Sequence, residues 1–409
     1  MPQAGHRSAM SRDYPPNPLP PFDFATARKV IFGWGRRREL PRHLPGLGRR
    51  CFILVGSRTL LRSGAAEEIA GLVRAAGCTV VDTAEIHREP QVADVDGLAE
   101  RWRSAADAGD GVIIALGGGA AIDLAKAVSA RLTHPEGDSI RDYLEGVGRG
   151  LKLCQPCLPV IALPTTAGTG TEATKNAVIA GLDPPFKKSL RDDRLLPALA
   201  IVDAELTVSA PAQVTAHSGM DAITQLIESY GSCRRAPIPE ALAESALRSA
   251  IPALRTLARD PQNRQAREAM AYAALVSGMC LANSGLGMAH GIAASLGVHI
   301  GLPHGLACAM MLLPTLEFNR VTETPRLAVL ARRVLDLPPS LPQEEQVNRL
   351  FEAISDLLAK LAIPRRLSEV GVRADQLPAI AAGSSGSSMN GNPREASQED
   401  VLAVLEGVL

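Results

Sequence analysis

The stretch GVIIALGGGAAIDLAKAVSARL, from Gly111 to Leu132, decides the fold of this chain. Its first part is a continuous apolar run typical of a buried strand, and its second part carries apolar residues at helical spacing. The glycines between them, Gly117 to Gly119, let the backbone turn tightly and let an anion approach the first N–H groups of the helix. The stretch therefore predicts a strand, a phosphate-binding turn and a helix. A tight turn that serves only packing is the alternative.

The same alternation of strand and helix extends on both sides of this stretch. Apolar strand-like runs occur at 50–55, 78–86 and 158–164, with amphipathic helical patterns between them. Near residue 205 the alternation stops, and apolar residues then recur every three or four positions. We predict a mobile N-terminal extension over 1–23, an α/β dinucleotide-binding domain with a parallel sheet over 24–205, and an all-helical metal and substrate domain over 206–409. A ligand site is expected in the cleft between the two domains.

The composition excludes several kinds of partner. Lys plus Arg and Asp plus Glu both number 43, so no charge excess favours binding to nucleic acid or to a membrane surface. The seven cysteines are an odd number scattered along the chain, which predicts reduced thiols and a cytoplasmic location. The N-terminus lacks the apolar segment of a secretory signal, and no apolar run reaches the roughly 18 residues of a transmembrane helix.

A second polar loop follows the strand at 158–164. The segment PTTAGTGTEAT carries hydroxyl groups on Thr165, Thr166 and Thr169, with small residues between them. Such a loop can hydrogen-bond to phosphate, ribose or amide groups, although threonines that only cap turns are the simpler interpretation. The two loops leave consecutive strands, and ligands of open α/β sheets bind where such loops meet.

The helical half contains residues that could hold a metal ion. Asp221 lies in the predicted helix GMDAITQLIES, and Gln225 falls on the same helical face one turn later. His290 and His304 follow in the segments SGLGMAH and GLPHG. Asp and His together are common ligands of divalent metals, although a single His among small residues is more often a packed core residue.

Several of these motifs occur together in one known order. GGGAAIDLAK, PTTAGTGTEAT, the GMDA helix, GLGMAHGIAASLG, LPHG and NGNPREAS make the chain resemble the iron-containing (group III) alcohol dehydrogenase family from about Arg28 to the C-terminus. The resemblance implies a dehydroquinate synthase-like fold. It also implies an NAD(P)-dependent oxidoreductase that transfers a hydride between the nicotinamide and a small alcohol or aldehyde. Members of the family are often dimers or larger, so a homodimer is compatible with the resemblance.

The resemblance also assigns site residues by position. It places Gly118, Gly119 and Asp123 at the pyrophosphate and ribose of the cofactor. The other cofactor positions that it implies are Thr165, Thr166, Thr169 and Lys187. Asp221, His290 and His304 match three metal ligands of the family, and His290 and His304 are the expected catalytic residues.

Two departures from the family pattern fall on the metal site. The family usually has His at the positions of Gln225 and Ala294. A Gln carbonyl is a poorer ligand than imidazole for Fe²⁺ or Zn²⁺. We nevertheless predict a divalent metal held by Asp221, Gln225, His290 and His304, because three of the usual ligands remain.

Three alternatives stay open. A metal-free reductase of an activated carbonyl, like the related maleylacetate reductases, would use His290 or His304 to supply a hydrogen bond or a proton. A dehydroquinate synthase-like lyase and a dinucleotide-binding protein with a decayed site are the others.

A third departure concerns the choice of cofactor. After the strand at 50–55, the family often has an Asp that binds the ribose 2′-hydroxyl of NAD, and here Ser57 occupies that position beside Arg58. Loss of the carboxylate removes repulsion against a 2′-phosphate, and a neighbouring Arg can pair with that phosphate. We predict that NADP(H) is accepted and preferred over NAD(H). The alternative is that Arg58 points into solvent without a ligand.

Overall fold

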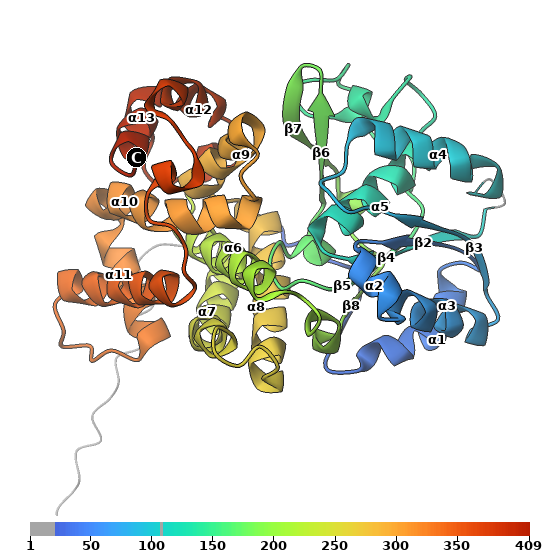
Figure 1. Cartoon of the computed structure of the whole chain (residues 1–409), viewed down its shortest axis with the longest axis horizontal. Coiled ribbons are helices and arrows are strands. Elements are labelled where there is room, and N and C mark those ends of the chain that lie inside the picture. Colours follow the sequence, from blue (N-terminus) through green and yellow to red (C-terminus); the bar gives the residue numbers. More distant parts are fainter. Residues whose placement is uncertain (1–20, 107–108) are drawn as a thin grey trace, which may run out of the picture.

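The computed structural model describes residues 21–106 and 109–409, so most of the extension predicted over 1–23 lies outside the described residues. Figure 1 shows two halves side by side, an α/β half from the N-terminal part of the chain and a helical half from the C-terminal part. This arrangement agrees with the fold class that the sequence predicts.

A six-stranded parallel sheet forms the centre of the α/β half, in the order β1-β8-β5-β4-β2-β3. The strands are β1 Val30–Phe32, β2 Arg50–Val55, β3 Thr79–Glu85, β4 Gly111–Gly117, β5 Val160–Pro164 and β8 Leu199–Val202. β4 pairs with β5 in parallel, so the glycine turn and the threonine loop leave adjacent strands at the same edge. The predicted meeting of these two loops is therefore confirmed.

Helices cover both faces of the sheet because successive strand residues point in opposite directions. Phe52 and Leu54 of β2 pack with α4 (Val92–Ala106) and α5 (Gly119–Thr133). Ile53 and Val55 pack on the other face with α1 (Leu40–His43), α2 (Arg58–Arg62) and α3 (Ala65–Ala75). The interior strands β4, β5 and β8 are therefore apolar along their whole length, and β2 is apolar after Arg50.

An antiparallel hairpin, β6 Asn176–Leu182 and β7 Pro185–Arg191, stands outside the main sheet. In Figure 1 it lies at the junction with the helical half, where β7 contacts α9. The hairpin was not predicted from the sequence. The signal was present, because Ala177 and Ile179 are buried in alternation with more exposed neighbours.

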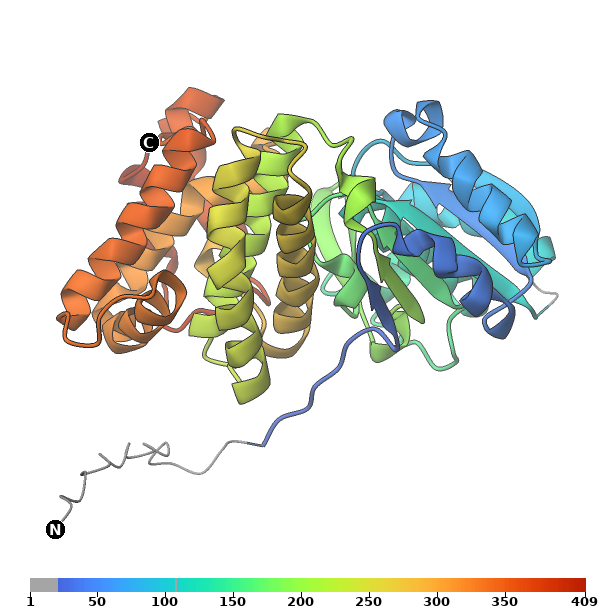
Figure 2. The same cartoon turned by 90° about the horizontal axis from the view of Figure 1, so that it is seen from below.

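The helical half begins with α6 at Ala212, after β8 ends at Val202. Figure 2 shows α6, α7 and α8 packed side by side next to the α/β half. One apolar core joins the helices of this half. The helices are α6 Ala212–Gly231, α7 Pro237–Leu257, α8 Arg264–Ser284, α9 Met288–Ile300, α10 His304–Leu335, α11 Gln343–Lys360, α12 Leu377–Gly383 and α13 Gln398–Glu406.

Short 3₁₀ helices complete the described secondary structure: η1 Arg36–Glu39, η2 Leu44–Gly46, η3 Ile140–Tyr143, η4 Thr171–Ala173, η5 Asp193–Leu195, η6 Ala204–Thr207, η7 Leu367–Val370, η8 Ala374–Gln376 and η9 Met389–Gly391. Within the described residues, no single helix has the length and apolar character needed to cross a membrane. Only α8 and α9 taken together, bent by 102°, meet that test, and both contribute to the buried core.

Candidate functional site

A cavity of about 450 Å³ lies between the two halves, lined by the glycine turn, the hairpin and the helices α6, α9 and α10. The predicted site residues that line it are Gly119, Asp123, Thr169, Lys187, Gln225, His290 and His304. Ser57, Arg58, Gly118, Thr165, Thr166 and Asp221 do not line this cavity. The cavity therefore brings part of the predicted cofactor site together with part of the predicted metal site.

The glycine turn and the threonine loop are in direct contact. A Cβ atom on Gly118 would lie 2.9 Å from Thr166 Oγ1, and one on Gly119 would lie 2.9 Å from Thr169 Oγ1. Any side chain at either glycine would displace the loop. α5 begins at Gly119 without a side-chain cap, so its first N–H groups are offered to a ligand.

Asp123 joins α5 to the hairpin. One carboxylate oxygen accepts a hydrogen bond from the Thr171 hydroxyl, and the other accepts one from the backbone N–H of Val178 at 3.1 Å. Burial raises the pKa of Asp123, although Lys126 and these hydrogen bonds oppose the shift. Because both oxygens already have partners, Asp123 positions the hairpin at the wall of the cavity.

Lys187 extends from β7 into the cavity. Its ammonium group pairs with Glu89 in the loop after β3. The positive charge of Lys187 also helps to lower the pKa of His304. The hairpin thus places a cation close to the histidines of the helical half.

Ser57 and Arg58 lie beyond β2, at the edge of the sheet where β4 also ends. The hydroxyl of Ser57 accepts a hydrogen bond from the backbone N–H of Leu60 at 3.3 Å and so caps α2. Arg58 is exposed, and within residues 21–106 and 109–409 it forms no ion pair. Its guanidinium group is therefore available to an anion.

A cluster of possible metal ligands forms where α6, α9 and α10 meet. Asp221 of α6 lies with one carboxylate oxygen 3.2 Å from His290 Nε2 and 3.9 Å from His304 Nε2. The ring centroids of the two histidines are 5.4 Å apart. Cys308 of α10 belongs to the same cluster, and one ligand atom from each of the four residues lies within 4.8 Å of the others. The structure thus brings together Asp221, His290 and His304, which were predicted as metal ligands, and adds Cys308, which was not predicted.

Glu228 is a further residue that sequence analysis missed. One of its carboxylate oxygens contacts His290 Nδ1, and the other accepts a hydrogen bond from the Ala289 backbone N–H at 2.7 Å. It therefore fixes the His290 ring, so that Nε2 faces Asp221. Glu228 lies seven residues after Asp221, on the same face of α6, and this spacing was the signal that could have found it.

The four clustered side chains perturb each other's ionisation. Burial raises the pKa of the Cys308 thiol to about 12. Burial also lowers the pKa of His304 to about 4, against the attraction of Asp221. For Asp221 and His290 burial opposes ionisation, but the contacts that each makes with its polar neighbours outweigh it. The pKa of Asp221 is therefore lowered, and the pKa of His290 is raised well above its usual value by Cys308, Glu228 and Asp221.

Gln225 lies one turn after Asp221 on α6, as predicted, and lines the cavity. Its side-chain oxygen accepts a hydrogen bond from the Ser277 hydroxyl of α8 at 2.9 Å. Ala294, at the other position where an imidazole is missing, also lines the cavity. The cavity wall therefore carries an amide and a methyl group where the family pattern has imidazoles.

The cluster fits a divalent metal ion. Asp221 and Glu228 are buried, and in the described part of the chain neither carboxylate has a Lys or Arg partner within ion-pair distance. Nε2 of His290 and Nε2 of His304 both lie near the same Asp221 oxygen, at 3.2 and 3.9 Å. Buried carboxylates need a compensating positive charge, and a cation next to two imidazoles and a carboxylate would provide it.

Comparisons with known proteins identify the family of this chain. The family model described as "Iron-containing alcohol dehydrogenase" matches residues 27–204, and the one described as "Fe-containing alcohol dehydrogenase family, C-terminal" matches residues 215–409. The 1,3-propanediol dehydrogenase of Klebsiella pneumoniae is 31% identical over 94% of this chain and 97% of its own length. The NADPH-dependent butanol dehydrogenase of Clostridium saccharobutylicum is 30% identical over 94% of this chain and 97% of its own length.

The fold is also found in solved structures. A crystal structure of a 1,3-propanediol oxidoreductase superimposes with a TM-score of 0.87 and 28% identity, covering 95% of this chain and 100% of that one. These relatives are dehydrogenases and oxidoreductases, and they do not favour the lyase or non-catalytic alternatives.

Proposed function

This chain belongs to the iron-containing alcohol dehydrogenase family and is an oxidoreductase that acts on CH–OH groups, and we propose that it interconverts small alcohols and aldehydes with NADP(H) at a metal-assisted site. The observation that carries the proposal is the cavity between the halves. Gly119 and Thr169 line one part of it, and His290 and His304 line another. A cofactor on the glycine turn and a substrate at the histidines would therefore share one cavity.

The residues of the chain have distinct roles in this proposal. The N–H groups at the start of α5 bind the cofactor pyrophosphate, and Thr169 lines the path toward the helical half. Asp221, His290 and His304 hold the metal, which supplies Lewis acidity to the substrate oxygen when it is bound. Glu228 orients His290 through Nδ1. The cavity walls exclude water and hold the two reacting carbon atoms together.

Arg58 supports the choice of NADP(H) over NAD(H). It is exposed at the end of β2, has no ion-pair partner among the described residues, and stands beside a serine rather than a carboxylate. A 2′-phosphate would supply the missing anion. A preference for NADH of tenfold or more, equivalent to about 1.4 kcal/mol, would contradict this part of the proposal.

The overall function is tested by following NADPH oxidation with a panel of small aldehydes, using protein that is prepared without oxygen and supplied with iron or zinc. We expect stoichiometric consumption of NADPH and aldehyde. The His304→Ala variant should lose turnover far more than cofactor affinity, whereas His299→Ala, an exposed histidine on α9, should retain both. Equal losses of turnover and cofactor affinity in His304→Ala would count against the role of His304.

A metal-free reductase of an activated carbonyl is the second candidate. It is favoured by Gln225 and Ala294, which remove two imidazoles from the wall of the site. In that case His290 or His304 supplies the hydrogen bond or the proton to the developing alkoxide. Full turnover after chelation and removal of all bound metal would select this candidate over the metal-assisted one.

A further inference from the structure

The ligand cluster contains a sulfur atom in addition to the carboxylate and imidazole groups already discussed. Cys308 is fully buried, does not line the cavity, and contributes its Sγ to the cluster with Asp221, His290 and His304. We propose that Cys308 is a thiolate ligand of the metal and takes the place of the imidazole that is missing at Gln225. This inference rests on the proposed function, because it requires that the site holds a metal.

The helical spacing explains how Cys308 reaches the site. Cys308 follows His304 by four residues on α10, so the two side chains lie on one face of the helix, one turn apart. The same spacing on α6 joins Asp221 to Gln225, and on α9 it joins His290 to Ala294. α10 therefore supplies a strong metal donor one turn after its first ligand, whereas α6 has an amide at that spacing and α9 has a methyl group.

The distances among the donor atoms fit a single ion. Zinc bonds of about 2.3 Å to sulfur and 2.1 Å to nitrogen place neighbouring tetrahedral ligands about 3.6 Å apart. Cys308 Sγ lies 3.7 Å from His304 Nε2, and Asp221 Oδ1 lies 3.2 Å from His290 Nε2 and 3.9 Å from His304 Nε2. These three separations lie close to the spacing that ligands of one zinc ion adopt.

Gln225 is less suited to be the fourth ligand. Its side-chain oxygen accepts a hydrogen bond from Ser277 with one lone pair, and the lone pair that remains belongs to a neutral amide, which is a weaker donor to a cation than a thiolate. The thiol of Cys308, in contrast, lies 3.7 Å from His304 Nε2, inside the cluster. Cys280, another fully buried cysteine, instead contacts the backbone carbonyl of Pro239 at 3.3 Å, away from the cluster.

Metal binding by Cys308 has a defined chemical consequence. The thiol loses its proton to solvent, and the sulfur lone pair of the thiolate forms the bond to the metal without any redox change. A thiolate among imidazole and carboxylate ligands is softer than the amide of Gln225, and this donor set favours zinc.

Cobalt substitution tests the proposal through the spectrum of the bound metal. The full chain is stripped of metal and loaded with Co²⁺, and the near-ultraviolet region is recorded for the thiolate-to-cobalt charge-transfer band. We expect the band in the wild type with one equivalent of cobalt, and its loss in Cys308→Ser. Cys280→Ser is the matched control, since it removes an equally buried thiol outside the cluster, and Gln225→Ala should also keep the band.

The metal affinity gives a second readout, measured by competition with a chelating dye. Cys308→Ser should bind zinc at least tenfold more weakly than Cys280→Ser. X-ray absorption of the zinc-loaded wild type should detect one sulfur at about 2.3 Å, a result that does not depend on whether any variant folds. A wild type that binds cobalt or zinc without a sulfur signal would overturn the role of Cys308 and leave the metal itself in place. A wild type that takes up no metal would overturn both.

Discussion

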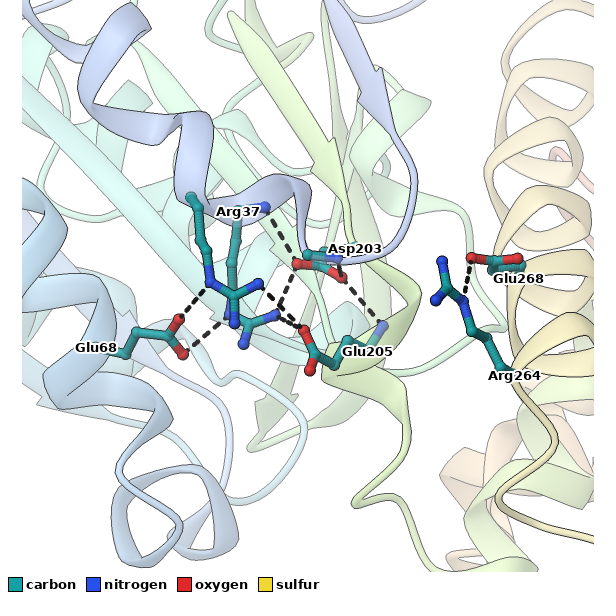
Figure 3. Close-up of polar contacts among 8 residues, drawn as sticks. Arg37, Glu68, Asp203, Glu205, Arg264 and Glu268 are labelled. Atoms are coloured by element: carbon teal, nitrogen blue, oxygen red, sulfur yellow. Dashed lines mark hydrogen bonds and ion pairs between the residues drawn. The ribbon is translucent and has the colours of Figure 1, made fainter.

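Two buried groups of charges in this molecule are balanced in different ways. In the α/β half, Arg37 lies between Glu68 on one side and Asp203 and Glu205 on the other (Figure 3). Its distances to Glu68 and Asp203 are 3.0 and 2.9 Å. In the helical half, the buried Asp221 and Glu228 have only histidines as ion-pair partners in the described part of the chain.

We infer from this difference that the charges around Arg37 stabilise the fold, whereas Asp221 and Glu228 serve to bind a ligand. The Arg37 group contains its own permanent cation, and burial of Arg37 is outweighed by Glu205, Glu68 and Asp203, which raise the pKa of the guanidinium. The Arg37 group joins η1 to η6, and its charges are balanced without a bound ligand. The Asp221 group contains no permanent cation, so a bound metal would complete its electrostatic balance.

The largest expected effect is the loss of turnover when Asp221, in the group without a permanent cation, is replaced. Asp221→Asn keeps the shape of the side chain but removes its negative charge. We expect metal-supported turnover to fall by about 10³-fold, since loss of a Lewis acid costs about 4 kcal/mol of transition-state stabilisation. The free energy of unfolding of the metal-free protein should change by less than about 1 kcal/mol. Steady-state kinetics and urea unfolding measure the two quantities, with the exposed Asp260→Asn as control.

The next effect is on stability at the group that contains Arg37. Arg37→Met leaves the buried Asp203 without its guanidinium partner, and we expect the free energy of unfolding to fall by about 3 kcal/mol. Arg38→Met is the matched control, because the Arg38 side chain is 60% exposed and its ion pairs are 3.8 Å long. That control should cost less than about 0.5 kcal/mol. If Arg37→Met lost metal binding while its stability was unchanged, the comparison between the two groups would fail.

A smaller effect is expected where a carboxylate supports a ligand without binding the metal itself. Glu228→Gln keeps the contact with His290 but loses the charge that holds the ring in place. The affinity for zinc should fall by about tenfold, as is usual when a supporting carboxylate of a metal-bound histidine is replaced. Competition with a chelating dye measures the change, and Glu244→Gln, an acidic residue of α7 that pairs with Arg333, serves as control. Unchanged affinity in Glu228→Gln would mean that His290 does not need this support.

The smallest effect concerns Arg58. Arg58 is a cation without an anionic partner among the described residues, whereas Asp221 is an anion without a permanent cation. Arg58→Ala should lower the ratio of kcat/KM for NADPH to that for NADH by about fivefold, because one exposed ion pair contributes up to about 1 kcal/mol. Arg62→Ala on the same short helix is the control and should leave the ratio unchanged. An unchanged ratio in Arg58→Ala would show that its guanidinium does not contact the cofactor.

The sequence predicted the parts of the fold that depend on local pattern. The apolar run of β4 and the glycine turn after it have a strong local signal, and the neighbouring threonine loop follows from the parallel order of strands. The hairpin was not predicted, because β6 begins only two residues after the threonine-rich loop and β7, PFKKSLR, is largely polar. Their alternation was readable only after the turn at 183–184 had been recognised as separating two strands.

The site was predicted in part for a similar reason. Asp221, His290 and His304 could be grouped by the resemblance to a known family, which fixes positions along the chain. Cys308 and Glu228 share helix faces with His304 and Asp221, but their roles also depend on which faces of α6 and α10 meet α9. A spacing of four or seven residues shows which side chains share a face, but it does not show what that face contacts. Packing in three dimensions supplies that information.

The most direct test of the account is the amount of metal bound per chain. Wild-type protein and Asp221→Asn would be prepared without oxygen, supplied with iron and zinc, desalted, and analysed by mass spectrometry of the elements. The account predicts close to one equivalent of metal in the wild type and almost none in Asp221→Asn. Wild-type protein that contains essentially no metal but still oxidises NADPH with an aldehyde would contradict it.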